Sequence, residues 1–406
     1  MPKKIQLGPP LITEHILPEG AVAEPVELSI VIPAMNEKIT VGEFVDWCHE
    51  GLQKAGIKGQ ILIVDSSSDE TPNIVLEHGG EVLRTPKRGL GRAYIDAIPF
   101  IRGKWVIMGD ADLTYDFRFV EGFLAKFRDG YEFIMGSRFK GTIEDGAMPP
   151  LHRYFGTPLT TWMLNFIYGS DYSDIHCGMR GLTLEALLKI DLNSQSWEYA
   201  SEMVLKASRL KMKIAEVPVQ FYKDRAGRFS HLKRMGWLSP WIAGWINLKV
   251  MLVYSPDSFL LKPGLILSAV GFSLSLSLSF TTFTIGNIAF NLHWMLLGLA
   301  CAILGYSCLQ IGVFACIIHG MRPSTSQPAE KYLTYNTGML VSGITTAIGL
   351  GLDAELVSKY IANGFRLPEF SKPAIFGLLL IILGFQTFCF TLLIEMLRRL
   401  KSKFRQ

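Results

Sequence analysis

Charged residues are scarce in this chain of 406 amino acids. Lys, Arg, Asp and Glu make up 19% of it, whereas a soluble globular domain has about 25%. Hydrophobic residues make up 49%, which excludes a disordered or fibrous chain. The scarcity is local, because residues 1–256 mix charged and apolar residues, whereas residues 263–397 contain long blocks with almost no charge. The composition therefore predicts a soluble domain joined to a membrane domain.

The sequence also lacks a cysteine framework and a strong net charge. Its six cysteines form no CxxC or Cys/His cluster with zinc spacing, so neither disulfides nor structural zinc are expected. A net charge of +4 is too small to indicate a nucleic-acid partner. Residues 1–27 are rich in Pro and Glu and have no continuous apolar core, which is unlike a signal peptide. We expect them to form an N-terminal arm.

The first half of the chain alternates strand and helix patterns. Short apolar runs occur at residues 28–33, 60–65, 80–84, 104–110 and 132–137, separated by helical stretches at 40–55, 71–78, 89–101 and 117–128. This alternation predicts an α/β domain with a Rossmann-like, mixed but mostly parallel sheet covered by helices. Ligands of such sheets bind beyond the carboxyl ends of the strands, where Asp65 and Asp110 stand.

Four apolar blocks in the second half are each long enough to cross a hydrocarbon core of about 30 Å. They lie at about residues 263–284, 293–318, 333–352 and 374–397. The alternative is four buried core helices, but four helices almost free of charge would leave a soluble domain without a polar surface. Lys and Arg in the loop after the second block and in the basic tail, residues 398–406, place the first domain, this loop and the tail in the cytosol by the positive-inside rule.

Residues 232–262 connect the two halves. They place Trp and Leu at helical spacing among Lys and Arg, just before the first predicted span. This pattern predicts one or two interfacial amphipathic helices in the headgroup region, with an ordinary core helix as the alternative.

Polar residues follow the first two predicted strands. They are Pro33, Asn36 and Glu37 after the first strand, and Asp65, Ser67 and Asp69 after the second. Glu37 could simply favour the N-terminus of a helix, and Asp69 could cap the next one. Asp65 is harder to explain, because a carboxylate at this edge of a sheet needs a partner. A ribose or a base would provide hydroxyl and N–H donors for it.

A third polar cluster, Asp110-Ala-Asp112, follows the strand at residues 104–110. Two carboxylates one residue apart at a strand end repel each other. A divalent ion that also holds a diphosphate would remove this conflict, since Mg²⁺ binds through one or two carboxylates and substrate phosphates. Thr114 offers a further oxygen ligand.

In this order, the three clusters resemble the pattern of family 2 glycosyltransferases, which are inverting enzymes with a GT-A fold. The resemblance is closer to polyprenyl-phosphate hexosyltransferases: the dolichol-phosphate glucose and mannose synthases and their bacterial undecaprenyl-phosphate relatives. It covers about residues 28–264. Further matching stretches lie at residues 88–92, 174–180, 200–203, 216–219 and 225–232.

The resemblance implies a GT-A catalytic domain at residues 28–231 and a set of ligands. The nucleotide sugar would contact Pro33, Asn36, Glu37, Asp65, Ser67, Asp69, Arg88 and Asp110, and Mg²⁺ or Mn²⁺ would bind Asp110, Asp112 and Thr114. Asp110 and Asp112 would also be catalytic, together with Arg180 and Glu202. Each of Arg88, Arg180 and Glu202 has a structural alternative: a solvated helix start, an Arg–Asp pair and a helix N-terminal acid, respectively.

A basic cluster lies where the soluble half approaches the predicted interfacial helices. It consists of Arg225, Arg228, Ser230 and His231. A polyprenyl phosphate is an anionic nucleophile that needs no general base, but it needs positive charge to hold and align it. Arg suits this task because its guanidinium binds phosphate through two N–H groups. We therefore predict that this cluster binds the lipid phosphate.

The predicted function is metal-dependent, inverting transfer of a hexose from a nucleotide sugar to a polyprenyl phosphate in the bilayer. On resemblance alone, UDP-glucose is the first choice of donor and GDP-mannose the second. The enzyme would be a multi-pass protein of a bacterial or archaeal plasma membrane, with a homo-oligomer left open. The alternatives are a processive polysaccharide synthase, whose Gln-x-x-Arg-Trp motif is missing from this sequence, and a non-catalytic flippase or scaffold membrane protein.

Overall fold

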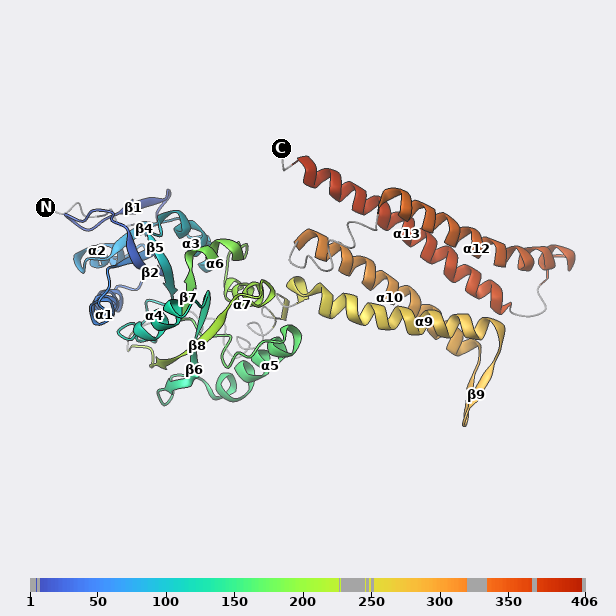
Figure 1. Cartoon of the computed structure of the whole chain (residues 1–406), viewed down its shortest axis with the longest axis horizontal. Coiled ribbons are helices and arrows are strands. Elements are labelled where there is room, and N and C mark those ends of the chain that lie inside the picture. The colour runs from blue at the N-terminus through green and yellow to red at the C-terminus, as the bar shows by residue number, and fades with distance from the viewer. Residues whose placement is uncertain are drawn as a thin grey trace. The chain divides into compact units, whose positions relative to one another are not determined.

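The computed structural model divides the chain into two compact units, Met1–Tyr254 and Ser255–Gln406 (Figure 1). It describes residues 5, 8–225, 227, 245, 248–249, 252–319, 334–366 and 371–403. Most of the predicted interfacial segment, residues 232–262, lies outside the described residues, so its amphipathic helices stay a prediction.

The first unit is built on an eight-stranded sheet with the order β1-β4-β3-β2-β5-β7-β6-β8. The strands are β1 (Glu14–Ile16), β2 (Val26–Ala34), β3 (Gly59–Asp65), β4 (Glu81–Arg84), β5 (Gly103–Met108), β6 (Phe133–Ile143), β7 (Arg180–Thr183) and β8 (Ile214–Phe221). Strands β2 to β5 run parallel to one another, and β8 runs parallel to β6. β7 is antiparallel to both β5 and β6. The prediction of a mixed, mostly parallel sheet is confirmed.

Helices cover both faces of this sheet (Figure 1). They are α1 (Val41–Lys54), α2 (Thr71–Glu77), α3 (Leu90–Ala97), α4 (Glu121–Arg128), α5 (Thr157–Tyr168), α6 (Leu184–Ile190) and α7 (Tyr199–Arg209). The centres of β2 and β3 are buried throughout, as expected of parallel strands with helices on both sides. Their continuous apolar runs are the reason that both strands could be recognised in the sequence.

The N-terminal arm and two late strands differ from the simple alternation. β1 comes from the arm, forms the edge of the sheet and pairs antiparallel with β4, where His15 Nε2 lies 3.1 Å from Glu81 Oε2. β7 is only four residues long, and Pro218 interrupts the apolar run of β8, so neither has a clear strand pattern. Their positions are set by pairing with β5 and β6.

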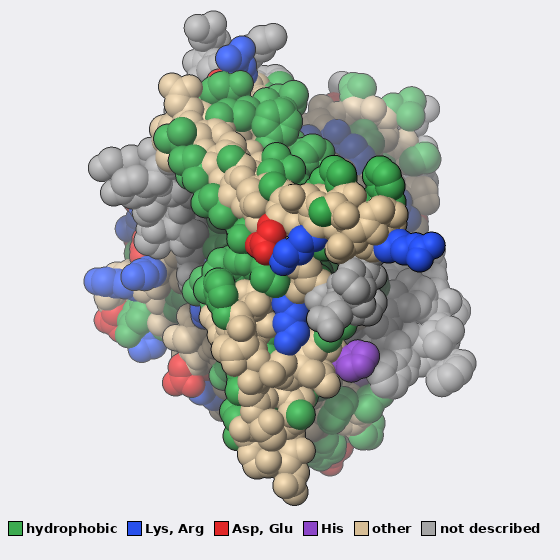
Figure 2. Space-filling model, turned by 90° about the vertical axis from the view of Figure 1, so that its right-hand side faces the viewer, with side chains coloured by type: hydrophobic (Ala, Val, Ile, Leu, Met, Phe, Trp, Pro, Cys, Tyr) green, Lys and Arg blue, Asp and Glu red, His purple; other side chains and the backbone are tan. Residues whose placement is uncertain are grey.

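Among its described residues, the second unit contains four helices that are long and apolar enough to cross a membrane. They are α9 (Lys262–Phe280), α10 (Leu292–His319), α12 (Tyr335–Ala362) and α13 (Lys372–Lys403), with the hairpin β9 (Phe283–Ile285) and β10 (Ile288–Phe290) between α9 and α10. In Figure 2 this unit shows hydrophobic and uncharged side chains with few charged ones among them. The prediction of four apolar helices is confirmed.

Three helix bounds differ from the apolar blocks. α9 ends at Phe280, short of residue 284, because Phe283–Ile285 form the strand β9. α12 continues ten residues beyond Leu352, because Asp353 ends the apolar run but not the helix, and Lys359 pairs with Glu355 one turn earlier at 2.7 Å. The part of the basic tail that the structure describes continues α13 as far as Lys403.

Small residues bring the membrane helices together in pairs. A Cβ added to Gly271 of α9 would lie 2.3 Å from the backbone N of Ala302 on α10, and one added to Gly349 of α12 would lie 2.6 Å from the carbonyl O of Gly377 on α13. Close backbone approach at glycine is a common way for helices to pack in lipid. A hydroxyl contact of 2.6 Å between Tyr306 and Thr387 joins α10 to α13.

Candidate active site

Three polar loops meet at one edge of the sheet because they follow neighbouring parallel strands. β2 lies between β3 and β5, and Ala34 at the end of β2 pairs with Asp65 at the end of β3. Met108 ends β5 beside Val31 of β2, so Asp110 follows at the same edge. The structure thus brings together the three clusters that the sequence pattern singled out.

The loops after β2 and β3 bind each other. Asn36 has a left-handed backbone with φ 58°. Its N–H donates to Ser67 Oγ at 2.7 Å, and its Oδ1 accepts the N–H of Ser68 at 2.9 Å. The N–H of Glu37 donates to Thr71 Oγ1 at 2.9 Å, and that hydroxyl donates to Asp69 Oδ1 at 2.6 Å. These contacts hold the polar edge in one shape.

Asp65 has a partner within the chain. Its Oδ2 lies 3.1 Å from Arg84 Nη1, and both side chains are buried. The pair is an ion pair by distance, but its geometry is not that of a hydrogen bond, so Oδ2 accepts no hydrogen bond from the residues that the structure describes. Burial raises the pKa of Asp65 above its ordinary value, although Ser67 and Arg84 lower it. Asp65 is fully buried, so a ligand would reach this acceptor only if the neighbouring side chains moved.

The Asp110-Ala-Asp112 segment turns sharply after β5. Leu113 has a φ of 62°, and Asp112 Oδ1 accepts the N–H of Thr114 at 3.0 Å and its hydroxyl at 2.5 Å. Thr114 is itself buried. Its hydroxyl therefore orients the Asp112 carboxylate. This geometry does not favour Thr114 as a direct metal ligand, which was the prediction.

The donor set suits a divalent ion that shares its ligands with a substrate. Among the described residues, no group of three or more His, Cys, Asp and Glu side chains could hold a metal. A magnesium-like ion needs only one or two carboxylates when phosphate oxygens supply further ligands. Asp110 and Asp112 fit such a shared site better than a closed protein site.

Gly178 is a residue at this site that the sequence pattern did not single out. β7 runs antiparallel to β5 and pairs Arg180 with Met108, so the residues before β7 lie against those after β5. A Cβ added to Gly178 would be 2.5 Å from Asp110 Oδ2. The N–H of Gly178 donates to Tyr115 Oη at 2.8 Å. The Asp110 carboxylate therefore occupies space that any residue other than glycine would fill.

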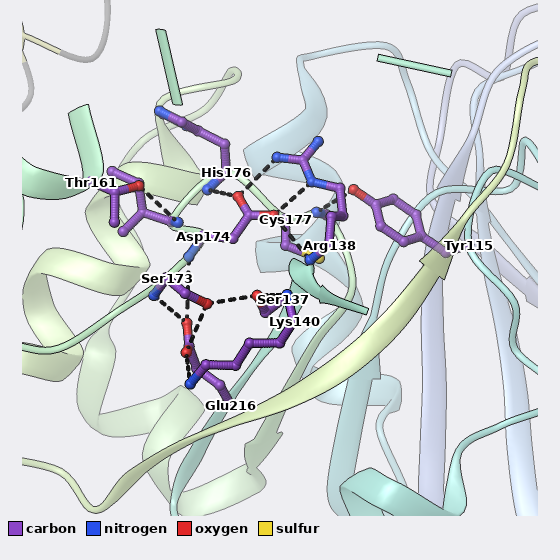
Figure 3. A network of polar contacts seen from close by, with 12 residues as sticks. Tyr115, Ser137, Arg138, Lys140, Thr161, Ser173, Asp174, His176, Cys177 and Glu216 are labelled. Carbon is purple, nitrogen blue, oxygen red and sulfur yellow. Dashed lines mark hydrogen bonds and ion pairs between the residues drawn. The ribbon is translucent and has the colours of Figure 1, made fainter. Parts of the chain in front are cut away.

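The loop that carries Gly178 is held by a buried ion pair (Figure 3). Arg138 donates from Nε to Asp174 Oδ2 at 2.6 Å and from Nη2 to Asp174 Oδ1 at 2.8 Å. Burial alone would raise the pKa of Asp174, but Arg138 lowers it below its ordinary value. The same carboxylate accepts the N–H of His176 at 3.2 Å. Residues 174–178 are thereby fixed to β6.

Arg180 and Glu202 are engaged inside the protein. Arg180 is buried and donates to the carbonyl oxygens of Cys177 at 2.9 Å and Ala200 at 2.5 Å. Asp174, the acid that precedes it in the same loop, pairs with Arg138 instead, so Arg180 does not form the Arg–Asp pair that was its structural alternative with this acid. Glu202 is also buried, with Lys206 Nζ at 2.5 Å, and it accepts the N–H groups of Asn193 and Ser194. These contacts favour structural roles for both, in place of the predicted contacts with sugar or diphosphate.

The two other arginines of the predicted site that the structure describes have acidic partners. Arg88 donates to Asp96 at 2.6 Å, which favours its structural alternative. Arg225 donates to Glu43 of α1 at 2.5 Å. The chain reaches Arg225 past the Asp112 loop, because the N–H of Tyr222 donates to the carbonyl O of Thr114 at 2.8 Å. The other predicted lipid-phosphate ligands lie outside the described residues; they are Arg228, Ser230 and His231.

Comparison with known proteins shows the family of this chain. Residues 29–190 match the family described as Glycosyl transferase family 2, and residues 313–398 match its C-terminal transmembrane region. The chain is 31% identical over 364 residues to the low-salt glycan biosynthesis hexosyltransferase Agl6 of Haloferax volcanii, which covers 88% of this chain and 86% of that protein. The chain belongs to glycosyltransferase family 2. It is therefore a glycosyltransferase with a GT-A-like domain and a C-terminal membrane region.

Two further proteins are similar to part of this glycosyltransferase. The dolichyl-phosphate hexose transferase of Haloferax volcanii is 28% identical over 204 residues, which cover 50% of this chain and 85% of that protein. The crystal structure of mannosyl-3-phosphoglycerate synthase from Rubrobacter xylanophilus matches with a TM-score of 0.43 and 22% identity, over 56% of this chain and 75% of that chain.

Replacing Gly178 tests the packing against Asp110. We expect Gly178→Ala to lower the rate of sugar transfer by about a hundredfold, the loss expected when a reacting group is displaced by about an ångström. The matched control is Gly156→Ala, where the new Cβ would have its nearest neighbour at an ordinary 3.5 Å. Steady-state kinetics and the unfolding midpoint should be measured for both. Equal activity in the two variants would contradict the assigned contact.

His176 makes the stability of this glycosyltransferase depend on pH. Burial lowers the pKa of His176 from 6.5 to about 4, while Asp174 opposes the shift. The unfolded chain takes up a proton below about pH 6.5 and the folded one only near pH 4, so stability present at neutral pH is lost as the pH falls across this window. The loss is on the order of 3 kcal/mol.

The unfolding midpoint in detergent at pH 7.5 and at pH 5 measures this dependence. We expect His176→Gln, which keeps a hydrogen-bonding side chain near the hydroxyl of Thr160, to reduce the difference between the two midpoints. An unchanged difference would show that His176 does not carry it.

Proposed function

We propose that this glycosyltransferase moves a hexose from a nucleotide sugar to a polyprenyl phosphate, with inversion at the anomeric carbon. The observation that carries the proposal is the convergence of Asp65, Asp110 and Asp112 at one sheet edge, beside the chain that leads to Arg225. The printed name of a relative, dolichyl-phosphate hexose transferase, supports the class of acceptor. The four apolar helices would keep the enzyme in the membrane that holds such a lipid.

The donor would bind along the edge formed by the three loops. Asp65 Oδ2 would accept a hydrogen bond from the base or the ribose, since it has no other hydrogen-bond donor among the described residues. The loops that contain Asn36, Glu37 and Asp69 would shape the remaining nucleotide pocket. UDP-glucose is our first choice of donor and GDP-mannose the second.

Asp110 and Asp112 would hold Mg²⁺ or Mn²⁺ together with the donor diphosphate. When bound, this ion would offset the negative charge that grows on the leaving nucleoside diphosphate. Thr114 keeps Asp112 turned toward the site, and Gly178 leaves space for Asp110. Arg180 and Glu202 would act by holding the loops beside the site.

The acceptor phosphate would approach from the side of Arg225. Its oxygen attacks the anomeric carbon as the bond to the nucleoside diphosphate breaks, so a polyprenyl-monophosphate hexose forms with inverted configuration. The oxygen is already anionic and needs no general base, and a guanidinium can hold and align it. Arg228, Ser230 and His231 would complete this cluster. We further propose that the enzyme works on the cytosolic side of an archaeal or bacterial plasma membrane.

The metal ligands can be tested with one substitution and one surface control. We expect Asp112→Asn to lower transfer by about a hundred- to a thousandfold, the range for loss of one strong electrostatic contact in a transition state. It should also weaken Mn²⁺ binding in the presence of UDP, measured by electron paramagnetic resonance. Asp129→Asn, at an exposed acid near the end of α4, should behave like the native protein.

The assay presents reconstituted protein with labelled UDP-glucose or GDP-mannose and with dolichyl or undecaprenyl phosphate. The expected result is label in the lipid phase. No lipid-soluble label from any nucleotide sugar would contradict the proposed acceptor, and unchanged activity of Asp112→Asn would contradict the metal site.

Two substitutions distinguish phosphate binding by Arg225 from the ion pair that it forms with Glu43. We expect Arg225→Ala to raise the KM for the lipid phosphate by about tenfold, the equivalent of one charge-assisted hydrogen bond, and to leave the KM for the nucleotide sugar unchanged. Glu43→Gln breaks the same ion pair but keeps the guanidinium, so it should not raise the KM for the lipid. If both variants raise it equally, the pair is structural and Arg225 does not bind the phosphate.

A further inference from the structure

The N-terminal arm is fastened to the first unit at three places. Its strand β1 pairs with β4 at the edge of the sheet (Figure 1). Nearer the start of the chain, the N–H of Ile5 donates to Asn73 Oδ1 at 3.0 Å. Between these two places, the carbonyl O of Gly8 accepts a hydrogen bond from Arg84 Nη2 at 2.6 Å. The first two contacts hold the arm in place, whereas the third brings it to a charged group at the end of β4.

Arg84 has a second neighbour inside the protein. Its side chain is buried, and its Nη1 lies 3.1 Å from Oδ2 of the buried Asp65. Among the described residues, neither of these two atoms has a hydrogen-bond partner. The ion pair is therefore held by charge alone, without a directional hydrogen bond. The guanidinium can turn away from the carboxylate unless another group fixes it, and the carbonyl O of Gly8 is such a group.

Asp65 connects this contact to the loops of the proposed nucleotide site. Its Oδ1 accepts the N–H of Ser67 at 3.2 Å, and Ser67 Oγ accepts the N–H of Asn36 at 2.7 Å. A continuous series of contacts therefore leads from the arm to the loops after β3 and β2. Burial raises the pKa of Asp65, while Ser67 and Arg84 oppose the rise. Displacement of Arg84 would favour the uncharged carboxyl, which is a weaker acceptor for Ser67.

We propose that the N-terminal arm positions the nucleotide-binding loops, and that it does so through Arg84. Gly8 and Arg84 are positioning residues in this assignment, because neither needs to touch the nucleotide or the reacting atoms. The inference rests on the proposed function in one respect, namely that a nucleotide binds along the loops after β2 and β3. It does not require a direct contact between the ligand and Asp65.

Two changes release Arg84 from the arm in different ways. Truncation of residues 1–12 removes Gly8 but keeps β1 and its pairing with β4. Arg84→Lys keeps the positive charge, but one compact ammonium cannot reach both neighbours as the forked guanidinium does. The matched control is truncation of residues 1–4, which keeps Ile5 and Gly8. All variants retain the membrane unit.

Isothermal titration calorimetry in detergent measures the binding of UDP and of GDP, each with Mn²⁺. We expect the longer truncation and Arg84→Lys each to weaken nucleotide binding about tenfold, the equivalent of one charge-assisted hydrogen bond. The control truncation should bind like the native protein. The combined variant should bind no more weakly than the weaker single variant, because both changes remove the same contact. Calorimetry also gives the fraction of protein able to bind, so partial unfolding lowers this fraction and leaves the dissociation constant unchanged.

A native dissociation constant for the longer truncation would overturn the proposal and would leave the arm as a cover for the edge of the sheet. A hundredfold loss in the combined variant would overturn it as well, because the arm and Arg84 would then act separately. In both cases the native protein still binds nucleotide, so the proposed function is unaffected. Failure of the proposed function is recognised by a different result, in which neither UDP nor GDP binds the native protein, and this inference then fails with it.

Discussion

The buried ion pair between Arg138 and Asp174 is the interaction on which the active-site edge depends. It joins residues 36 positions apart in the sequence and fastens the loop before β7 to β6. That loop delivers Gly178 to Asp110, at a distance that leaves no space for a side-chain carbon. Breaking one partner of a buried pair leaves an uncompensated charge and typically costs about 3–5 kcal/mol. The Asp110 carboxylate is thus positioned by an ion pair that lies outside the acidic edge itself.

Repulsion between acidic groups explains how the rest of the edge is built. Asp65 ends β3, whereas Asp110 and Asp112 follow β5 on the other side of β2, and each of the three has a neighbour that fixes its position. Arg84 lies beside Asp65, Thr114 turns Asp112, and the backbone of Gly178 packs against Asp110. Asp65 retains an oxygen without a hydrogen-bond donor among the described residues, which is costly in a buried place unless a ligand supplies the donor. Such incomplete satisfaction is typical of a binding site rather than of a core.

The chain is adapted to two solvents. Its second unit exposes apolar helices that only lipid can cover, and glycines allow these helices to pack in pairs. Its first unit has an ordinary buried core around the sheet, yet α5 turns its aromatic residues outward. A lipid-linked acceptor would require both features, because the nucleotide sugar is dissolved in water and the acceptor is held in the bilayer.

The sequence by itself determined the α/β alternation, the four apolar helices and the acidic residues at the strand ends. Each of these features depends on local periodicity or on the residue that follows an apolar run. From its order along the chain, Arg225 was predicted to lie where the first half approaches the interfacial segment and to bind the lipid phosphate, and this stays a prediction. Only the tertiary structure decided that Arg180, Glu202 and Arg88 have partners inside the protein, since the atoms they contact include backbone carbonyls and N–H groups that carry no sequence signal. The same holds for Gly178 and for α5. A glycine is required only where another chain segment approaches it, and helical spacing shows that a helix has an apolar side without showing whether that side faces inward or outward.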